Sequence, residues 1–386
     1  MRDECLRTII LVAGSVLTGW IAWSGHVLFL PAAIAFPILW SLARVRWQAA
    51  VVSAAYFLAA SRGLPQGVAN FYGTDLWPGV QLWLIASISF VMVHCVLWTS
   101  RDGLHPPIRY LVAGIVMAVP PFGIMGWAHP VTAAGVLFPA WGWWGLAAMA
   151  AGLAIMTTRH RPAAAMAMSG LWLWSAASWT APVLLPSWIG VDLQTGSSLG
   201  RNVSFERQNA LIDLARGHPS GATVILPESA IGFWTPTVAR LWQRGLAETG
   251  VTVIAGATII DESGYDNVLV KISPEGLVVL YRQRMPVPGS MWQPWRRISA
   301  GGGGASAYFF ANPAIDIAGS KVAPLICYEQ LLVWPILQSA LHRPDVILAV
   351  SNGWWTAGTA VVDIQRASTE AWARLFNLPL VFSVNT

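Results

Sequence analysis

Long apolar stretches dominate the first half of this 386-residue chain. A helix of about 20 apolar residues is long enough to cross a lipid bilayer. Seven apolar stretches near this length occur, at residues 8–24, 27–43, 47–61, 79–99, 108–126, 131–156 and 163–181, of which the third is the shortest. Only 11% of the chain is charged, against about 25% in soluble domains. Residues 1–182 are therefore predicted to form a polytopic membrane domain with about seven transmembrane helices.

Aromatic and basic residues support this interpretation and predict an orientation. Tryptophan and tyrosine gather near the ends of the stretches, as they do at membrane interfaces: Trp20, Trp23, Trp47, Trp77, Trp98, Tyr110 and Trp127. One set of alternate connections holds eight arginines, and the other holds only Arg62. Because arginine marks the cytoplasmic side, the N-terminus is expected in the cytoplasm. An odd number of crossings then places the residues after 182 in the periplasm of a Gram-negative cell.

Residues 190–386 have the pattern of a folded α/β domain. Strand-like runs occur at residues 221–226, 251–256, 268–273, 277–282, 314–317, 321–326, 345–350 and 380–384. Helical patterns lie between them, at residues 204–217, 235–249, 330–342 and 360–377. This alternation favours a mixed sheet covered by helices. The glycine-rich residues 299–306 are either a plain linker or a mobile lid.

The overall charge excludes some classes of partner. Residues 1–189 hold nine arginines and four acidic residues, a net charge of +5, whereas residues 190–386 hold fourteen of each sign. A nucleic-acid site would instead gather basic residues on a folded face. The seven histidines lie far apart without metal-ligand spacing. No metal, cofactor or nucleic acid is therefore expected, and three scattered cysteines predict no disulfide framework.

Cys327 is the candidate nucleophile of the second half. It follows a strand-like run and precedes Tyr328 and Glu329, and it is the only cysteine after residue 95. A thiol at a strand end beside a carboxylate is often a presented nucleophile. A lone cysteine is more commonly a small buried apolar side chain. By itself, Cys327 leaves both interpretations open.

Four short motifs at predicted strand ends favour the first interpretation. They are LPESA (226–230), YRQRMPVP (281–288), LICYE (325–329) and SNGWW (351–355). Together they resemble the carbon–nitrogen hydrolase, or nitrilase, superfamily. Behind a polytopic membrane block, they resemble its membrane branch, the apolipoprotein N-acyltransferases.

The segment that follows the second motif narrows the resemblance. RMPVP (284–288) with Met291 and Trp292 is similar to a family of plasmid conjugal-transfer proteins. The resemblance implies a nitrilase-like αββα sandwich for residues 190–386 and a multi-pass protein of the bacterial inner membrane. It also implies contact with the phospholipid bilayer, and a pilin or other conjugation protein as a candidate partner.

The resemblance assigns chemistry to individual residues. In this superfamily a cysteine thiolate forms a thioester with an acyl group, a glutamate moves the protons, and a lysine stabilises the oxyanion. Cys327 would be the nucleophile, Glu228 the general base and Glu329 a supporting acid. The alternative for Glu228 is a cap of the helix predicted near residue 235. The motifs also supply candidate substrate-binding residues, namely Arg284, Tyr328, Asn352, Trp354 and Trp355.

The catalytic lysine of the superfamily is replaced by Gln283. A glutamine can donate a neutral hydrogen bond to an oxyanion, but it brings no charge. The adjacent Arg284 is charged, yet neighbouring side chains on a strand point to opposite faces. The membrane span that follows the domain in the acyltransferases is also missing from this sequence. The domain is therefore expected to be trimmed or completed by a partner.

Three functions fit these departures. The first is an acyl or amide transferase that uses Cys327, Glu228 and Gln283 on a membrane lipid or a small membrane peptide, such as a conjugative pilin. The second is a pseudoenzyme that binds an acyl chain or a partner without turnover. The third is a membrane scaffold of the mating apparatus. The pair of Cys327 and Glu228 separates the first function from the others, because a pseudoenzyme that has lost the lysine needs neither a nucleophile nor a base.

Overall fold

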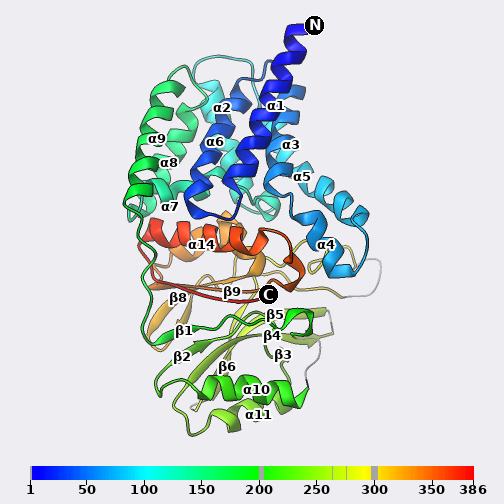
Figure 1. Cartoon of the computed structure of the whole chain (residues 1–386), viewed down its shortest axis with the longest axis vertical. Coiled ribbons are helices and arrows are strands. Elements are labelled where there is room, and N and C mark those ends of the chain that lie inside the picture. Colours follow the sequence, from blue (N-terminus) through cyan, green and yellow to red (C-terminus); the bar gives the residue numbers. More distant parts are fainter. Residues whose placement is uncertain (1, 200–203, 263, 275, 297–302) are drawn as a thin grey trace. The chain divides into compact units, whose positions relative to one another are not determined.

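The computed structural model describes residues 2–199, 204–262, 264–274, 276–296 and 303–386 (Figure 1). The chain divides into two compact units. The first unit comprises Met1–Pro182, Leu331–Trp334 and Gly358–Leu378. The second comprises Val183–Gln330, Pro335–Ala357 and Pro379–Thr386. The chain therefore passes between the units more than once.

The first unit is helical in its described residues. Its α-helices are α1 (Arg2–Ala22), α2 (Ala35–Ser41), α3 (Arg46–Ala60), α4 (Leu64–Tyr72), α5 (Trp77–Leu97), α6 (His105–Ala118), α7 (Ala134–Leu137), α8 (Gly142–Ile155), α9 (Arg161–Ala177) and α14 (Val361–Phe376). Short 3₁₀ helices are η1 (Val27–Ile34), η2 (Phe122–Met125) and η3 (Pro130–Ala133). Each of the seven predicted stretches is helical, but three of them are broken into shorter pieces. Proline accounts for such breaks because it lacks the N–H that a helix interior needs.

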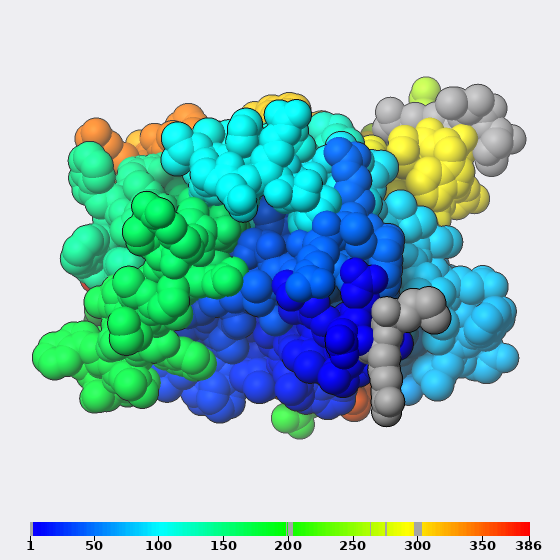
Figure 2. Space-filling view, turned by 90° about the horizontal axis from the view of Figure 1, so that it is seen from above, coloured from blue at the N-terminus to red at the C-terminus, as the bar shows by residue number. Residues whose placement is uncertain are grey.

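Two of these helices are long and apolar enough to cross a bilayer, at Asp3–Ala22 and Trp77–Leu97, within the part of the chain that the structure describes. Figure 2 looks onto a face built from the helices of the first half of the chain, from α1 in blue to α9 in green. Large apolar side chains are exposed on these helices, including Leu17, Ile85 and Trp174. Seven crossings stay a prediction.

Helix α14 packs within the first unit, although its sequence pattern lies among the strands of the second half. Gly135 of α7 lies so close to α14 that an added Cβ would meet the carbonyl oxygen of Ala371. Arg374 of α14 donates to the carbonyl of Thr180 and lies over the ring of Trp179. The α14 layer expected for a sandwich of residues 190–386 is thus packed against helices of the first half.

The second unit contains two β-sheets. The first sheet has the order β1 (Trp188–Gly190), β2 (Thr223–Ile225), β4 (Thr252–Asp261), β5 (Gly264–Ser273) and β6 (Gly276–Arg282), with β3 (Gly232–Phe233) on β4. The second has the order β10 (Leu380–Asn385), β9 (Val346–Asn352), β8 (Ser320–Ile326) and β7 (Ile315–Ile317). Strands β5 and β6 form the predicted hairpin, and β8, β9 and β10 are parallel.

Apolar cores lie on both sides of the first sheet. One core joins it to helices α10 (Phe205–Arg216) and α11 (Pro236–Leu246), through Leu211 and Trp242. The other lies between the two sheets and includes Leu269, Tyr281 and Val350. The unit therefore has a helix layer and two sheets (Figure 1), which are three of the four layers of the predicted αββα sandwich, while α14 belongs to the first unit. The remaining helices are α13 (Val333–Ala340), η4 (Gly196–Ser198), η5 (Cys327–Leu331) and η6 (Trp354–Thr356).

The glycine-rich segment is described only from Gly303 onward, and the rest of residues 299–306 lies outside the described ranges. The described part is held against β5. The N–H of Tyr265 donates to the carbonyl of Gly304, and the N–H of Ser306 donates to the carbonyl of Tyr265. This part of the segment is thus bonded to the sheet.

Candidate active site

Cys327 lies where β8 ends and η5 begins, between the two sheets of the second unit. Its backbone has a φ of 49°, in the left-handed region that residues other than glycine seldom adopt. The side chain is buried, with an exposed fraction of 5%. Strained backbone of this kind is concentrated at functional sites, where the surrounding structure holds it in place.

Glu228 is buried and contacts Cys327. Its carboxylate accepts hydrogen bonds from Asn267 Nδ2 at 2.6 Å and from the backbone N–H of Asn352 at 3.0 Å. The Cys327 side chain makes a third hydrogen bond to it. Burial raises the pKa of Glu228, and the nearby charge of Glu329 raises it further, while these three hydrogen bonds oppose the shift. A carboxylate bonded to a thiol, with a raised pKa, is suited to take the thiol proton.

The turn after β2 positions Glu228. Ser229 has a φ of 62°, and the turn lies directly against Gly256 of β4. A Cβ at residue 256 would lie 2.4 Å from the Cα of Glu228. The carboxylate thus reaches the site because β4 carries a glycine at this point. The alternative role for Glu228 as a helix cap does not apply, because the side chain of Thr235 caps α11.

Gln283 lies one residue beyond β6 and is almost fully buried. Its Nε2 donates to the carbonyl of Ile326 at 3.1 Å, and its Oε1 accepts from Asn267 Nδ2 at 3.0 Å. Gln283 is therefore joined to Glu228 through Asn267 and to Cys327 through the preceding peptide group. Its predicted role as an oxyanion donor is not tested by these contacts.

Glu329 holds the turn that carries Cys327. Its carboxylate accepts from the backbone N–H of Ile326 at 2.7 Å, from the backbone N–H of Arg284 at 2.6 Å and from the hydroxyl of Tyr281 at 2.8 Å. Burial raises the pKa of Glu329, and the positive charge of Arg284 opposes this shift. These bonds tie η5 to the end of β6, so Glu329 supports the site by fixing the Cys327 backbone.

Arg284 points away from Gln283, as strand alternation predicts, and it is fully buried. Its Nε donates to Tyr281. The other four guanidinium N–H groups reach the carbonyls of Pro335 and Pro324 and the side chains of Gln338 and Ser339. All five donors are engaged within the protein. These contacts do not fit the expected substrate-binding role, and they make Arg284 a buried tie between β6, β8 and α13.

The other motif residues lie near the ends of β8 and β9. Tyr328 is buried, and Trp354 and Trp355 are partly exposed in η6. Asn352 contacts Glu228 through its backbone, while its side-chain oxygen accepts from Asn385 at 2.8 Å. Substrate binding by Tyr328, Asn352, Trp354 and Trp355 stays a prediction.

Asn267 is the central site residue that sequence reasoning missed. It lies on β5 outside the four motifs, and its side chain joins Glu228 to Gln283. Its signal in the sequence was the expected β-hairpin, because cross-strand pairing brings β5 beside the strand that precedes Gln283. The hydrogen bond from the Gln283 N–H to the Asn267 carbonyl confirms that the two residues are cross-strand neighbours.

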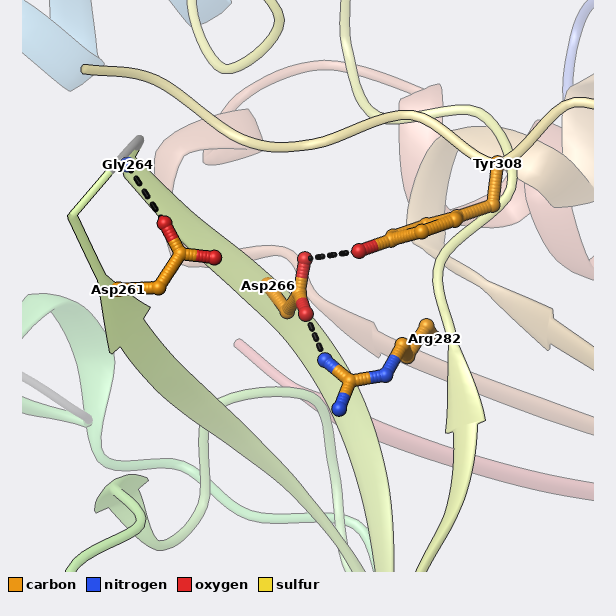
Figure 3. Close-up of polar contacts among 5 residues, drawn as sticks. All are labelled: Asp261, Gly264, Asp266, Arg282 and Tyr308. Atoms are coloured by element: carbon orange, nitrogen blue, oxygen red, sulfur yellow. Dashed lines mark hydrogen bonds and ion pairs between the residues drawn. The ribbon is translucent and has the colours of Figure 1, made fainter. Parts of the chain in front are cut away.

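The opposite face of the same hairpin is also tied by polar groups. Figure 3 shows the buried Asp266 carboxylate between the hydroxyl of Tyr308, at 2.9 Å, and the guanidinium of Arg282, with which it forms an ion pair. Where β4 meets β5, the Asp261 carboxylate accepts from the N–H of Gly264. Asp266 and Arg282 directly precede Asn267 and Gln283, so this ion pair helps to fix the strands that carry the site.

Among the described residues, no group of three or more histidine, cysteine or acidic side chains is arranged to hold a metal ion.

The sequence of the chain is similar to known proteins. It is 60% identical over 388 residues to a probable conjugal transfer protein TraB of Sinorhizobium fredii, covering all of both chains. It is 55% identical over 392 residues to a conjugal transfer protein TraB of Agrobacterium fabrum, covering 98% of this chain and 93% of the relative.

Solved structures show a more distant likeness. An amidase from Nesterenkonia is 13% identical with a TM-score of 0.38, and the match covers 53% of this chain and 78% of the amidase. A carbon–nitrogen hydrolase from Helicobacter pylori is 16% identical with a TM-score of 0.36, covering 51% and 73%. The model of the carbon–nitrogen hydrolase family matches residues 58–374. Because that match spans most of the sequence, the chain belongs to the carbon–nitrogen hydrolase family.

Proposed function

We propose that this protein is a membrane-anchored acyl or amide transferase that acts through a thioester on Cys327. The observation that carries the proposal is the hydrogen bond between Cys327 and the buried carboxylate of Glu228. A nucleophile and a base in contact, with the base held by further groups, is the arrangement that covalent acyl transfer requires.

The proposed reaction has two steps. Glu228 takes the thiol proton while the sulfur of Cys327 attacks the acyl carbonyl. The C–S bond forms, and the leaving alcohol or amine departs with the proton from Glu228. An amine or a water molecule then attacks the thioester and gives its proton to Glu228, which returns it to the sulfur as the C–S bond breaks. The two steps replace one more difficult displacement.

Gln283 is the proposed oxyanion donor. Its amide nitrogen carries two N–H groups, one of which bonds to Ile326. We assign the other to the oxyanion of the tetrahedral intermediate. Such donors are typically worth about 3–4 kcal/mol in the transition state. A neutral amide provides a weaker field than an ammonium, so slow turnover is expected.

The proposed setting is the inner membrane, with the second unit in the periplasm. The apolar helices and the arginine pattern support this setting. The substrate would be a membrane lipid or a small membrane peptide. The names of the two relatives refer to conjugal transfer, which makes a conjugative pilin one candidate acceptor.

A mass measurement tests the thioester. Full-length protein purified from membranes is incubated with candidate acyl donors and analysed by intact-protein mass spectrometry. We expect an added acyl mass that hydroxylamine removes, and its loss in C327A. The matched control is Cys95→Ala, which removes a thiol of the first unit. Plasmid transfer should fall to background in C327A and not in the control. Normal transfer by folded C327A would exclude the catalytic function.

A second candidate function is a binding protein without turnover. It is favoured by one observation, namely that Gln283 occupies the lysine position and bonds to two internal groups. In that case C327A would keep plasmid transfer, and no acyl mass would appear on Cys327 with any donor.

A further inference from the structure

Asn267 links the general base to the residue that replaces the lysine. It lies on β5 with an exposed fraction of 3%. Its Nδ2 donates to Glu228 Oε1 at 2.6 Å and to Gln283 Oε1 at 3.0 Å. An amide nitrogen has two N–H groups, so these two acceptors use both of them.

These two bonds fix the orientation of the Asn267 amide. In the flipped orientation, its oxygen would face two other oxygens. In the orientation that the structure has, the Oδ1 atom of Asn267 is buried and finds no hydrogen-bond partner among the described residues. A buried acceptor without a partner is unfavourable. The bonds to Glu228 and Gln283 therefore outweigh that penalty and set the direction of the amide.

The orientation of Asn267 in turn sets the orientation of Gln283. Because Gln283 presents its oxygen to Asn267, its nitrogen faces the carbonyl of Ile326, which belongs to the peptide bond that joins Ile326 to Cys327. A lysine has three donors and no acceptor, so it cannot accept from Asn267 as Gln283 does. The residues at positions 267 and 283 are thus chemically matched.

We propose that Asn267 is a positioning residue that makes a neutral glutamine workable in this site, by holding Glu228 toward Cys327 and by directing the Gln283 nitrogen. This inference rests on the proposed function, because it assumes that Glu228 activates Cys327.

The test measures the alkylation of Cys327 by iodoacetamide as a function of pH. It uses the full-length protein in detergent with C5S and C95S, which leave Cys327 as the only thiol. We expect N267A to slow alkylation at neutral pH about tenfold, the effect of losing one charge-assisted hydrogen bond. The pH midpoint should also rise, because Glu228 loses a bond that favours its ionised form. The matched control is Asn209→Asp, a partly buried amide on α10.

A charge-compensated pair separates positioning from folding. N267D places a carboxylate against two acceptors and should slow alkylation at least as much as N267A. In N267D/Q283K, the new ammonium donates to the new carboxylate and to Ile326. The rate should then rise above that of N267D but stay below that of the parent, because the coupled pair restores the bond between residues 267 and 283 and not the donor to Glu228.

The outcomes are distinct for the two proposals. The positioning role is overturned if N267A keeps the parent rate and midpoint, or if N267D/Q283K is no faster than N267D. An unchanged pH profile in E228Q would instead overturn the proposed function, because Glu228 would then have no influence on the thiol.

Discussion

Glu228 is held among partners that oppose the effect of its burial. Burial raises its pKa above the usual value of 4.5, whereas the hydrogen bonds from Asn267, Asn352 and Cys327 lower it. The net result is a raised pKa, so the Glu228 carboxylate accepts a proton more readily than an exposed glutamate does. That property suits a residue that must receive the thiol proton and return it.

A pH dependence follows from this residue. As the proposed base, Glu228 must be ionised to take the thiol proton, so the rate of thioester formation should rise with pH through its raised pKa. Stability should show the opposite trend. The contribution of Glu228 is fully present below its unfolded pKa of about 4.5 and is lost as pH rises through the folded value. Melting temperatures measured against pH should therefore fall less steeply in E228Q than in the parent. Equal slopes for the two proteins would contradict the raised pKa.

The contacts of individual residues also explain which members of the candidate site could be predicted from the sequence. Cys327, Glu228 and Glu329 stand in short motifs at strand ends, so their proximity follows from the pattern. Asn267 stands in no motif, and only the pairing of β5 with β6 brings it to the site. The sequence also does not predict that all five guanidinium donors of Arg284 bond within the protein, because its partners on α13 are far away in the sequence.

Elements hold the site by close backbone approach as well as by side chains. Gly256 of β4 lies against the turn that carries Glu228, and a Cβ there would lie 2.5 Å from the backbone nitrogen of Ser229. This nitrogen and the Cα of Glu228 both belong to the backbone, so a clash with an added Cβ cannot be relieved by a rotamer change.

Gly256→Ala should therefore displace Glu228. We expect a destabilisation of about 1–3 kcal/mol, typical of overpacking, and a loss of the pH-dependent alkylation of Cys327. The control is Gly170→Ala on α9, where an added Cβ meets nothing within 4 Å. Unchanged alkylation in folded G256A would show that the turn shifts without moving the carboxylate.

The sequence predicted the strands and helices of the second unit well, because their periods and turn residues are strong. It missed the short strands β1 and β3, whose two or three residues carry too little pattern. It also placed the helix at residues 360–377 within the domain of residues 190–386, whereas α14 belongs to the first unit. The close contact of α14 with Gly135 depends on a glycine more than 200 positions earlier, and no local pattern shows it.

The whole molecule combines a helical unit with a sandwich that holds a complete cysteine–glutamate pair. The hydrogen bonds described above for Glu228, Asn267 and Gln283 all come from residues of the second unit. The chemistry of the thiol is therefore expected to depend on that unit, while access to an acyl donor depends on where the unit lies. The membrane topology of the chain therefore determines which acyl donors can reach Cys327.

The number of crossings determines that location. Helix α8 has 14 residues and is about 21 Å long at 1.5 Å per residue, whereas a bilayer core is about 30 Å thick. Because helices this short do not match the thickness of the bilayer core, the predicted count of seven crossings needs a direct test.

Alkaline phosphatase fused after Thr386 should be active, and green fluorescent protein at the same point should be dark, if the second unit is periplasmic. Fusions after Asp102, in a predicted cytoplasmic connection, should give the reverse pattern. A fluorescent, phosphatase-inactive fusion at Thr386 would require an even number of crossings, and it would place Cys327 on the cytoplasmic side.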